Sequence, residues 1–264
     1  MFYVGVSRTL TSTKPAPAAP SESRRNPRFR TVALGVLAIL IFSPGTTQAG
    51  AFDVLGFEPS PSSLAAFRLK RGISGDVQRT NSYRAAREFM FSQLDNVNGQ
   101  VEGVYSGREI QTRNIPDTNL MNTEHSFAQS WFKNRLPATE AAKAKADVHH
   151  LFPTLSHLNS LRGSLPFGEV SDRVPPLEGG SRCDGNQFEP RDNFKGNIAR
   201  ALFYFSARYG VSIPDNQEPT LRRWNQQDPV DQAERAREQG IFEFQGNHNP
   251  FVQDSTLVER IGDF

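Results

Sequence analysis

The chain has 264 residues, with 30 Lys and Arg against 28 Asp and Glu, and a formal net charge of +2. This near balance excludes a strongly basic protein that attracts nucleic acid through its overall charge, so a polyanion has to be met locally, by an arginine cluster or a metal ion. Cys183 is the only cysteine, which excludes an internal disulfide, so the fold has to be held by its core.

The first 51 residues have the layout of a secretory signal peptide. A cluster of four arginines, Arg24, Arg25, Arg28 and Arg30, directly precedes the apolar stretch TVALGVLAILIF (31–42), and the small-residue segment TTQAGA (46–51) follows it. This apolar stretch is shorter than the roughly 20 residues that a membrane-spanning helix needs. We therefore expect a secreted or periplasmic protein without a stable membrane anchor after cleavage.

The part that follows the signal peptide is long enough for one domain, at about 213 residues. It has 24 Lys and Arg against 27 Asp and Glu, a net charge of −3. Segment 52–80 is poorly patterned. After it, apolar spacing predicts a helix over 80–94, which Thr80 or Asn81 can cap. Alternation around a glycine predicts a strand, a turn and a second strand within 100–110.

The middle of the chain predicts a small strand–strand–helix unit over 121–163. Its first strand is expected in LMNTEHSFA (120–128) and its second in DVHHLFP (147–153), where the proline ends it. A helix capped by Thr154 and ended by glycine follows. Between the strands, ATEAAKAKA (138–146) is strongly helical by propensity and is expected to be an exposed surface insertion.

The C-terminal part is predicted to be mostly helical. A Pro- and Gly-rich loop is expected over 168–193, and a helix with one apolar stripe over 193–210. The segment 228–240 has the features of another helix, with Asp228 as its cap and a glycine after its end. The segment 241–252 is expected to close the chain as a strand and a turn.

The chemistry of the chain is concentrated at Glu124 and His125. Adjacent side chains of a strand point to opposite faces, so the pair can lie on two sides of a reacting group, or at a strand end where the alternation breaks down. In-line attack on a phosphodiester needs a base where water enters and a cation near the leaving oxygen. A neutral imidazole suits the first role, and a carboxylate suits the second because Mg²⁺ prefers oxygen ligands. Asn159 could add an oxygen ligand without adding charge.

Each of these residues also has a plainer interpretation. Taken alone, Glu124 and His125 are more often a solvated pair, and Asn159 is more often a surface residue of a helix. The neighbouring His149 and His150 invite a zinc site, but adjacent side chains diverge and the sequence provides no HxxxH or cysteine partner.

Four segments resemble, in this order, the bacterial endonuclease I family of secreted or periplasmic nucleases with a ββα-metal (His-Me finger) site. They are MNTEHSFAQSW, DVHHLFPTLSHLNSLRGSLPFG, FEPRDNFKGNIARALFYF and QGNHNPFV. The likeness covers roughly residues 80–255. It implies an α+β, mostly helical single domain over 81–264, built around a ββα finger at about 121–163.

The resemblance implies a role for several residues. His125 matches the general base, and Glu124 and Asn159 match the ligands of Mg²⁺ or another divalent cation such as Mn²⁺ or Ca²⁺. His149 and His150 match a motif that supports the site. The implied protein is an exported, metal-dependent and largely non-specific endonuclease that acts on DNA, with RNA left open as a second substrate. We expect it to be a monomer.

Three arginines are candidates for substrate binding: Arg162, Arg108 and Arg135. The chain also departs from the family pattern at three places, Thr123 before the Glu–His pair, Ser164 after Arg–Gly, and Glu238 after an arginine. Two alternatives stay open, and the near-neutral charge and these departures support the first of them. One is a non-catalytic nucleic-acid-binding module that retains the nuclease fold, and the other is a hydrolase acting on a different phosphodiester or on cell-wall material.

Overall fold

The computed structural model describes residue 72 and residues 77–264. The expected signal peptide (1–51) and most of segment 52–80 lie outside the described residues. The described residues form one α+β unit of helices and small antiparallel sheets, as the sequence predicts. Among them, no helix has both the length and the apolar character needed to cross a bilayer.

The first described helix confirms the sequence prediction but begins at a different cap. Helix α2 spans Tyr83–Phe89 and continues as a π-helix over Met90–Leu94. Its N-cap is Ser82, whose hydroxyl accepts a main-chain N–H of the first turn at 3.1 Å. The predicted caps, Thr80 and Asn81, lie upstream of the helix.

A three-stranded antiparallel sheet follows, with strand order β1-β2-β3. The strands are β1 (Asn96–Val97), β2 (Gln100–Glu102) and β3 (Glu109–Gln111). Asn98 and Gly99, which connect β1 to β2, both have positive φ, at 54° and 85°. Two such residues form the tight turn whose twist matches a hairpin. The predicted strand–turn–strand corresponds to β2 and β3.

The predicted strand–strand–helix unit is present. Strand β4 (Met121–His125) pairs antiparallel with β5 (Leu151–Leu155), and helix α5 (Ser156–Arg162) follows directly. The register places Glu124 opposite Phe152 and His125 opposite Leu151. Glu124 and His125 therefore lie at the C-terminal end of β4.

Two details of this unit differ from the prediction. The histidine pair forms a 3-10 turn, Val148–His150, before the strand begins. Pro153 lies inside β5 and does not end it, because its carbonyl accepts from Val104 N–H at 2.9 Å, on the side away from β4. The missing proline N–H thus interrupts no pairing. Thr154 is a residue of β5 and does not cap α5.

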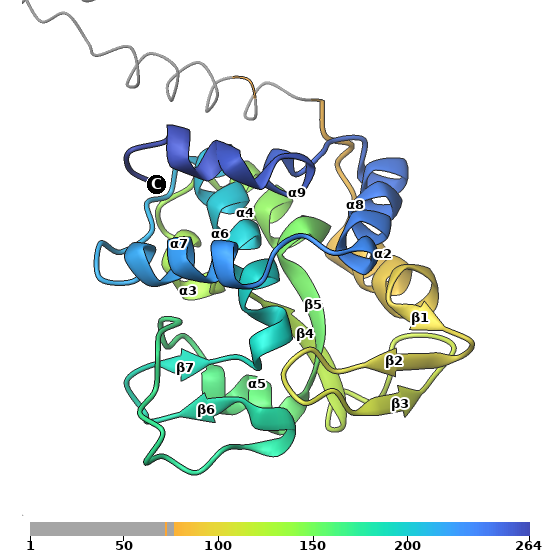
Figure 1. Ribbon diagram of the computed structural model, residues 1–264. Coiled ribbons are helices and arrows are strands. Elements are labelled where there is room, and N and C mark those ends of the chain that lie inside the picture. The colour runs from red at the N-terminus through yellow and green to blue at the C-terminus, as the bar shows by residue number, and fades with distance from the viewer. Residues whose placement is uncertain (1–71, 73–76) are drawn as a thin grey trace, which may run out of the picture. The chain divides into compact units, whose positions relative to one another are not determined.

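The remaining elements surround this unit (Figure 1). They are α3 (Gln129–Phe132), α4 (Ala138–Lys145), β6 (Arg182–Cys183), β7 (Phe188–Glu189), α6 (Lys195–Tyr209), α7 (Glu218–Gln227), α8 (Gln232–Gln245) and α9 (Pro250–Gln253), with short 3-10 turns at Glu178–Gly180, Asp192–Phe194 and Ser255–Arg260. In Figure 1, β4 and β5 run from the helices at the top towards the small sheets below. Helix α6, mostly buried, is the central helix of the core, and β6 and β7 lie within the predicted loop 168–193.

The prediction is wrong at the C-terminal end. Helix α8 is capped by Asp231, not Asp228, and it runs through Gly240 until Gly246, which has φ 88°. A Cβ at Gly240 would lie 2.8 Å from the Leu94 side chain. This glycine therefore allows close packing and does not end the helix. The segment predicted as strand and turn forms the end of α8, a turn and α9, and α7 was not predicted.

A buried carboxylate fixes the histidine turn to the helical core. Asp147 accepts hydrogen bonds from the hydroxyls of Tyr204 (2.8 Å) and Tyr209 (2.7 Å) on α6, and from the amide of Gln245 (2.8 Å) at the end of α8. It also accepts from the main-chain N–H of His149 at 3.1 Å. The start of β5 is thus positioned by residues about 60 to 100 positions later in the chain.

Candidate active site

The structure brings the three predicted catalytic and metal-binding residues to one pocket. Glu124 and His125 at the end of β4 and Asn159 on α5 all line a hollow of about 240 Å³. Gln129 and Arg162 line it too. Glu124 and His125 both line this pocket although they are adjacent at the end of β4. The rest of the pocket wall comes from α5 and from the residues that follow β4 and α5.

Glu124 is a buried carboxylate whose partner is an arginine. The residue is 1 % exposed, and its Oε1 lies 2.9 Å from Nη1 of Arg162, which is also 1 % exposed. The pKa of Glu124 is raised overall, because burial outweighs the Arg162 charge and the nearby Tyr105 hydroxyl, which both lower it. Arg162 and Tyr105 therefore favour the charged form that a cation site needs.

The ion pair does not saturate the carboxylate. Arg162 directs N–H groups at the main-chain oxygens of His125 (2.9 Å) and Ser126 (2.8 Å), so its contact with Glu124 Oε1 is an ion pair without an aligned hydrogen bond. A carboxylate has about four lone-pair sites. Glu124 can therefore keep its arginine and still bind another positive group.

The surroundings of His125 define its neutral tautomer. Nε2 lies 3.2 Å from the main-chain oxygen of Lys145. A carbonyl can only accept, so Nε2 carries the hydrogen and Nδ1 is left as the acceptor. Nδ1 lies 3.3 Å from the side-chain amide of Gln129, a residue of the pocket lining. Burial, with the neighbouring His150 as the next cause, lowers the pKa of His125 well below its ordinary value.

The orientation of Asn159 follows from its hydrogen bonds. Its Nδ2 donates to the main-chain oxygen of Thr123 at 3.1 Å and to the side-chain oxygen of Asn122 at 2.6 Å. Because the Thr123 carbonyl can only accept, Nδ2 is the atom that faces β4. The amide oxygen of Asn159 is thereby left for a ligand.

His149 and His150 point in different directions from the turn that precedes β5. The His150 ring lies against His125, with 5.4 Å between centroids, and its Nε2 donates to the Ala144 carbonyl at 2.7 Å. His149 is directed away, towards the Asn247 carbonyl at 3.0 Å. The two imidazoles do not converge on a common ion.

Helix α4 is not the exposed insertion that the sequence predicts. Its face towards the core is buried at Ala144, and its last carbonyls, from Ala144 and Lys145, hold the imidazoles of His150 and His125. These carbonyls, the Gln129 amide and the Tyr105 hydroxyl were missed at the sequence level. Only Gln129 carried a local signal, because it lies four residues after His125 at the start of the next helix.

The three arginines proposed for substrate binding have different surroundings. Arg162 is buried in the wall of the pocket as the partner of Glu124. Arg108 is exposed and lies 3.8 Å from Glu178, and Arg135 is exposed. Neither of these two lines the pocket. Phosphate contact by any of the three stays a prediction.

The donor set fits a hard divalent cation that keeps part of its water shell. Within residue 72 and residues 77–264, no group of three or more His, Cys, Asp or Glu side chains is arranged to hold a metal. Glu124 and Asn159 instead offer one carboxylate and one amide oxygen to the same pocket. Mg²⁺ commonly binds through one or two protein oxygens, waters and a substrate phosphate.

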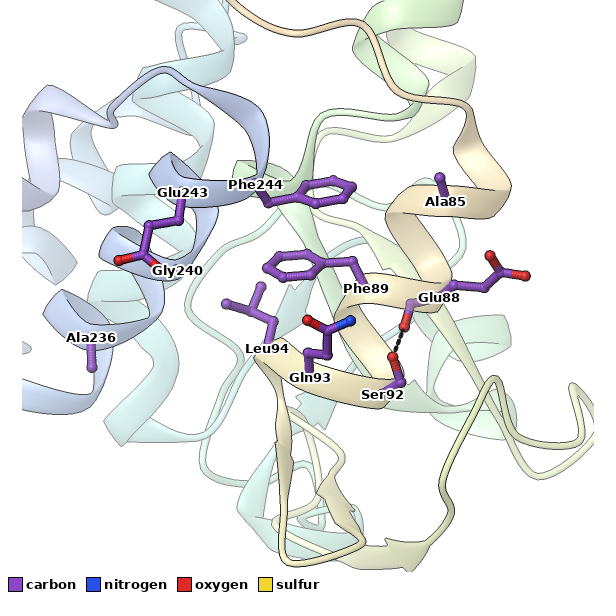
Figure 2. A pocket seen from close by; sticks show the side chains of 10 residues that line it. All are labelled: Ala85, Glu88, Phe89, Ser92, Gln93, Leu94, Ala236, Gly240, Glu243 and Phe244. Atoms are coloured by element: carbon purple, nitrogen blue, oxygen red, sulfur yellow. Dashed lines mark hydrogen bonds between the residues drawn. The ribbon is translucent and has the colours of Figure 1, made fainter.

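A larger hollow, of about 700 Å³, lies between α2 and α8, away from this site. Figure 2 shows the rings of Phe89 and Phe244 stacked on each other inside it, 4.1 Å between centroids. Glu88 and Glu243 line it, with no lysine or arginine among its lining residues. Its charge is therefore unfavourable for a polyanion.

The fold and the pocket define a class of protein in which a ββα unit presents a histidine, a carboxylate and an amide to one pocket. The Endonuclease I family profile matches residues 84–256, so the chain belongs to this family. An extracellular ribonuclease of Bacillus amyloliquefaciens is 35% identical over 158 residues, 53% of this chain and 53% of the relative. An extracellular deoxyribonuclease of Aeromonas hydrophila is 30% identical over 128 residues, 46% and 54% of the two chains. The chain spans about half the length of these curated relatives.

The Glu124–Arg162 pair predicts a strong coupling between the two positions. Arg162→Met leaves a buried charge without its counterion and should lower the free energy of unfolding by roughly 3–5 kcal/mol. Adding Glu124→Gln should recover a large part of this loss. Urea unfolding of the two single variants and the double variant measures the coupling, and additive losses would contradict a direct interaction.

The burial of His150 predicts a loss of stability in acid. Its pKa is lowered from 6.5 to about 4, chiefly by burial. The unfolded state binds this proton near pH 6.5 and the folded state only near pH 4, so the contribution is complete above pH 6.5 and is lost as the pH falls to 4. The loss amounts to roughly 3 kcal/mol. Unfolding measured across this window should show a shallower pH dependence in His150→Gln; an unchanged slope would refute the assignment.

Proposed function

We propose that this protein is an exported, metal-dependent and largely sequence-non-specific endonuclease that hydrolyses phosphodiester bonds of DNA, with RNA as a possible second substrate class. The observation that carries the proposal is the convergence of a neutral imidazole and two oxygen donors, from His125, Glu124 and Asn159, on one pocket. Membership of the Endonuclease I family supports the same reaction class.

His125 is suited to be the general base. Its Nε2–H is bound by the Lys145 carbonyl, so the basic atom is Nδ1, on the side of Gln129 and the pocket. The Gln129 amide N–H beside Nδ1 marks a position where the O–H of an attacking water could donate in its place. The lowered pKa keeps the imidazole unprotonated at neutral pH.

Glu124 and Asn159 are the residues that would hold the cation. A divalent ion bound there supplies positive charge to the phosphate and to the departing oxygen. Arg162 fixes the carboxylate of Glu124, while Asn122 and Thr123 fix the amide of Asn159. Both ligands are therefore held in place before an ion binds, which lowers the cost of ordering them.

The names of the relatives support the substrate class and the location. They include an extracellular ribonuclease, an extracellular deoxyribonuclease and a periplasmic deoxyribonuclease. We infer a nucleic acid substrate and a position outside the cytoplasm, which agrees with the signal peptide predicted at 1–51. A monomer stays a prediction.

His125→Ala should reduce plasmid nicking by roughly 100-fold or more, because a positioned general base contributes about that factor. His157→Ala is the matched control, since His157 is exposed on α5 and outside the pocket. Circular dichroism should show the same fold for both. Full nicking by His125→Ala would remove the proposed base. DNA binding without nicking by the unaltered protein would instead support the binding-module alternative.

Chelation by EDTA should stop nicking, and added Mg²⁺ should restore it. Mg²⁺ should also raise the melting temperature of the unaltered protein, because a ligand of the folded state stabilises it. In Asn159→Ala this shift should require a higher Mg²⁺ concentration. Activity that persists in EDTA would exclude the metal mechanism, and an unchanged Mg²⁺ dependence in Asn159→Ala would exclude this ligand.

A further inference from the structure

We propose that Arg87 on α2 and Lys145 at the end of α4, both packed on Tyr83, form a phosphate-binding surface beside the pocket, next to His125 and Thr123, and contact the nucleic acid backbone beside the reacting bond. The inference rests on the proposed function, because it takes a nucleic acid as the ligand. It adds a binding element from outside the ββα unit.

The three side chains are gathered next to His125. The Tyr83 ring lies 5.3 Å from the His125 ring, measured between centroids. The Lys145 ammonium lies 4.7 Å from the centre of the Tyr83 ring, and the Arg87 guanidinium carbon lies 5.7 Å from it. One aromatic ring thus joins two cations and the proposed base.

Both cations are also tied to residues of the pocket. Arg87 donates from Nε to the hydroxyl of Thr123 at 3.2 Å, and Thr123 lines the pocket directly before Glu124. Lys145 binds His125 through its main-chain oxygen, so the origin of its side chain is fixed relative to the base. Arg87 and Lys145 are both partly exposed.

These two charges are not neutralised by carboxylates. In the part of the chain that the structure describes, neither Arg87 nor Lys145 forms an ion pair, whereas their neighbours Arg84 and Lys143 pair with acidic residues at 2.8 and 2.9 Å. Tyr83 is partly buried, and a cation–π contact stabilises by only about 0.5–1 kcal/mol at exposed sites and about 2 kcal/mol when desolvated, so it is no full substitute for a counterion. Two unpaired cations beside a site for a phosphodiester are better explained by an anionic ligand.

The other basic residues near the site are not equivalent. Arg162 is committed to Glu124 and to main-chain oxygens, and Arg108 lies near Glu178. The part of the chain after residue 51 is slightly acidic, with 24 Lys and Arg against 27 Asp and Glu. Attraction of a polyanion therefore depends on local cations, and Arg87 and Lys145 are the ones adjacent to the base.

The test is a binding measurement that needs no turnover. A fluorescent DNA duplex is titrated with the protein in EDTA at several KCl concentrations, using the variants Arg87→Gln and Lys145→Gln. Each should weaken binding by roughly threefold to tenfold at low salt and reduce the slope of log K against log [KCl] by about 1. The double variant should reduce it by about 2.

Arg84→Gln and Lys143→Gln are the matched controls. They make the same charge change on the same two helices, at residues that already have Glu88 and Glu140 as partners. Their affinities and salt slopes should stay close to those of the unaltered protein. If Arg87→Gln and Lys145→Gln behave like these controls and melt at the same temperature, the two cations do not bind the backbone and the inference is wrong.

Plasmid nicking separates this inference from the proposed function. With active unaltered protein, Arg87→Gln and Lys145→Gln should raise KM more than they lower kcat. Unaltered nicking in both variants together with unaltered salt slopes would overturn the binding role and leave the nuclease in place. A protein that never nicks, but whose DNA affinity falls in these two variants, would overturn the nuclease and keep the binding surface.

Discussion

The ion pair between Glu124 and Arg162 is the interaction on which the site depends. Both side chains are almost fully buried, so the pair is made at the cost of removing two charges from water. Such a pair adds little net stability compared with apolar residues of the same size. Its effect is positional: it joins the end of β4 to the end of α5, one turn beyond Asn159. The Glu124 carboxylate and the Asn159 amide are thereby brought to the same pocket.

The proposed base, His125, is also held by contacts from several elements. His125 is held through main-chain oxygen by Arg162, through Nε2 by the end of α4, and through its ring by His150. His150 belongs to the turn that Asp147 fastens to α6 and α8. The protonation state of one imidazole therefore depends on helices far apart in the sequence. Charge on these buried rings is disfavoured, which is why acid should weaken the fold and the site together.

Short-range periodicity and spacing were sufficient to predict the strand–strand–helix unit and the helices α2 and α6. The convergence of Glu124, His125 and Asn159 on one pocket was implied by the resemblance to the family. The sequence was insufficient where a distant contact overrides a local signal. Gly240 has the local features of a helix end, but the structure uses it to let Leu94 pack closely against α8. Pro153 would end a strand only if its missing N–H were needed for pairing, and here it is not. Tyr105, the α4 carbonyls and Arg87 reach the site through tertiary packing, and no spacing in the chain marks them.

The departure at position 123 gains a physical meaning from this packing. Thr123 offers no charge of its own, but its hydroxyl accepts from Arg87, so a guanidinium from α2 is brought to the residue that precedes Glu124. Arg87 forms no ion pair with Glu124 among the described residues, and the counterion of that carboxylate is Arg162. Arg162 thus lies in the wall of the pocket as the counterion of Glu124, and Arg87 contacts Thr123 from α2.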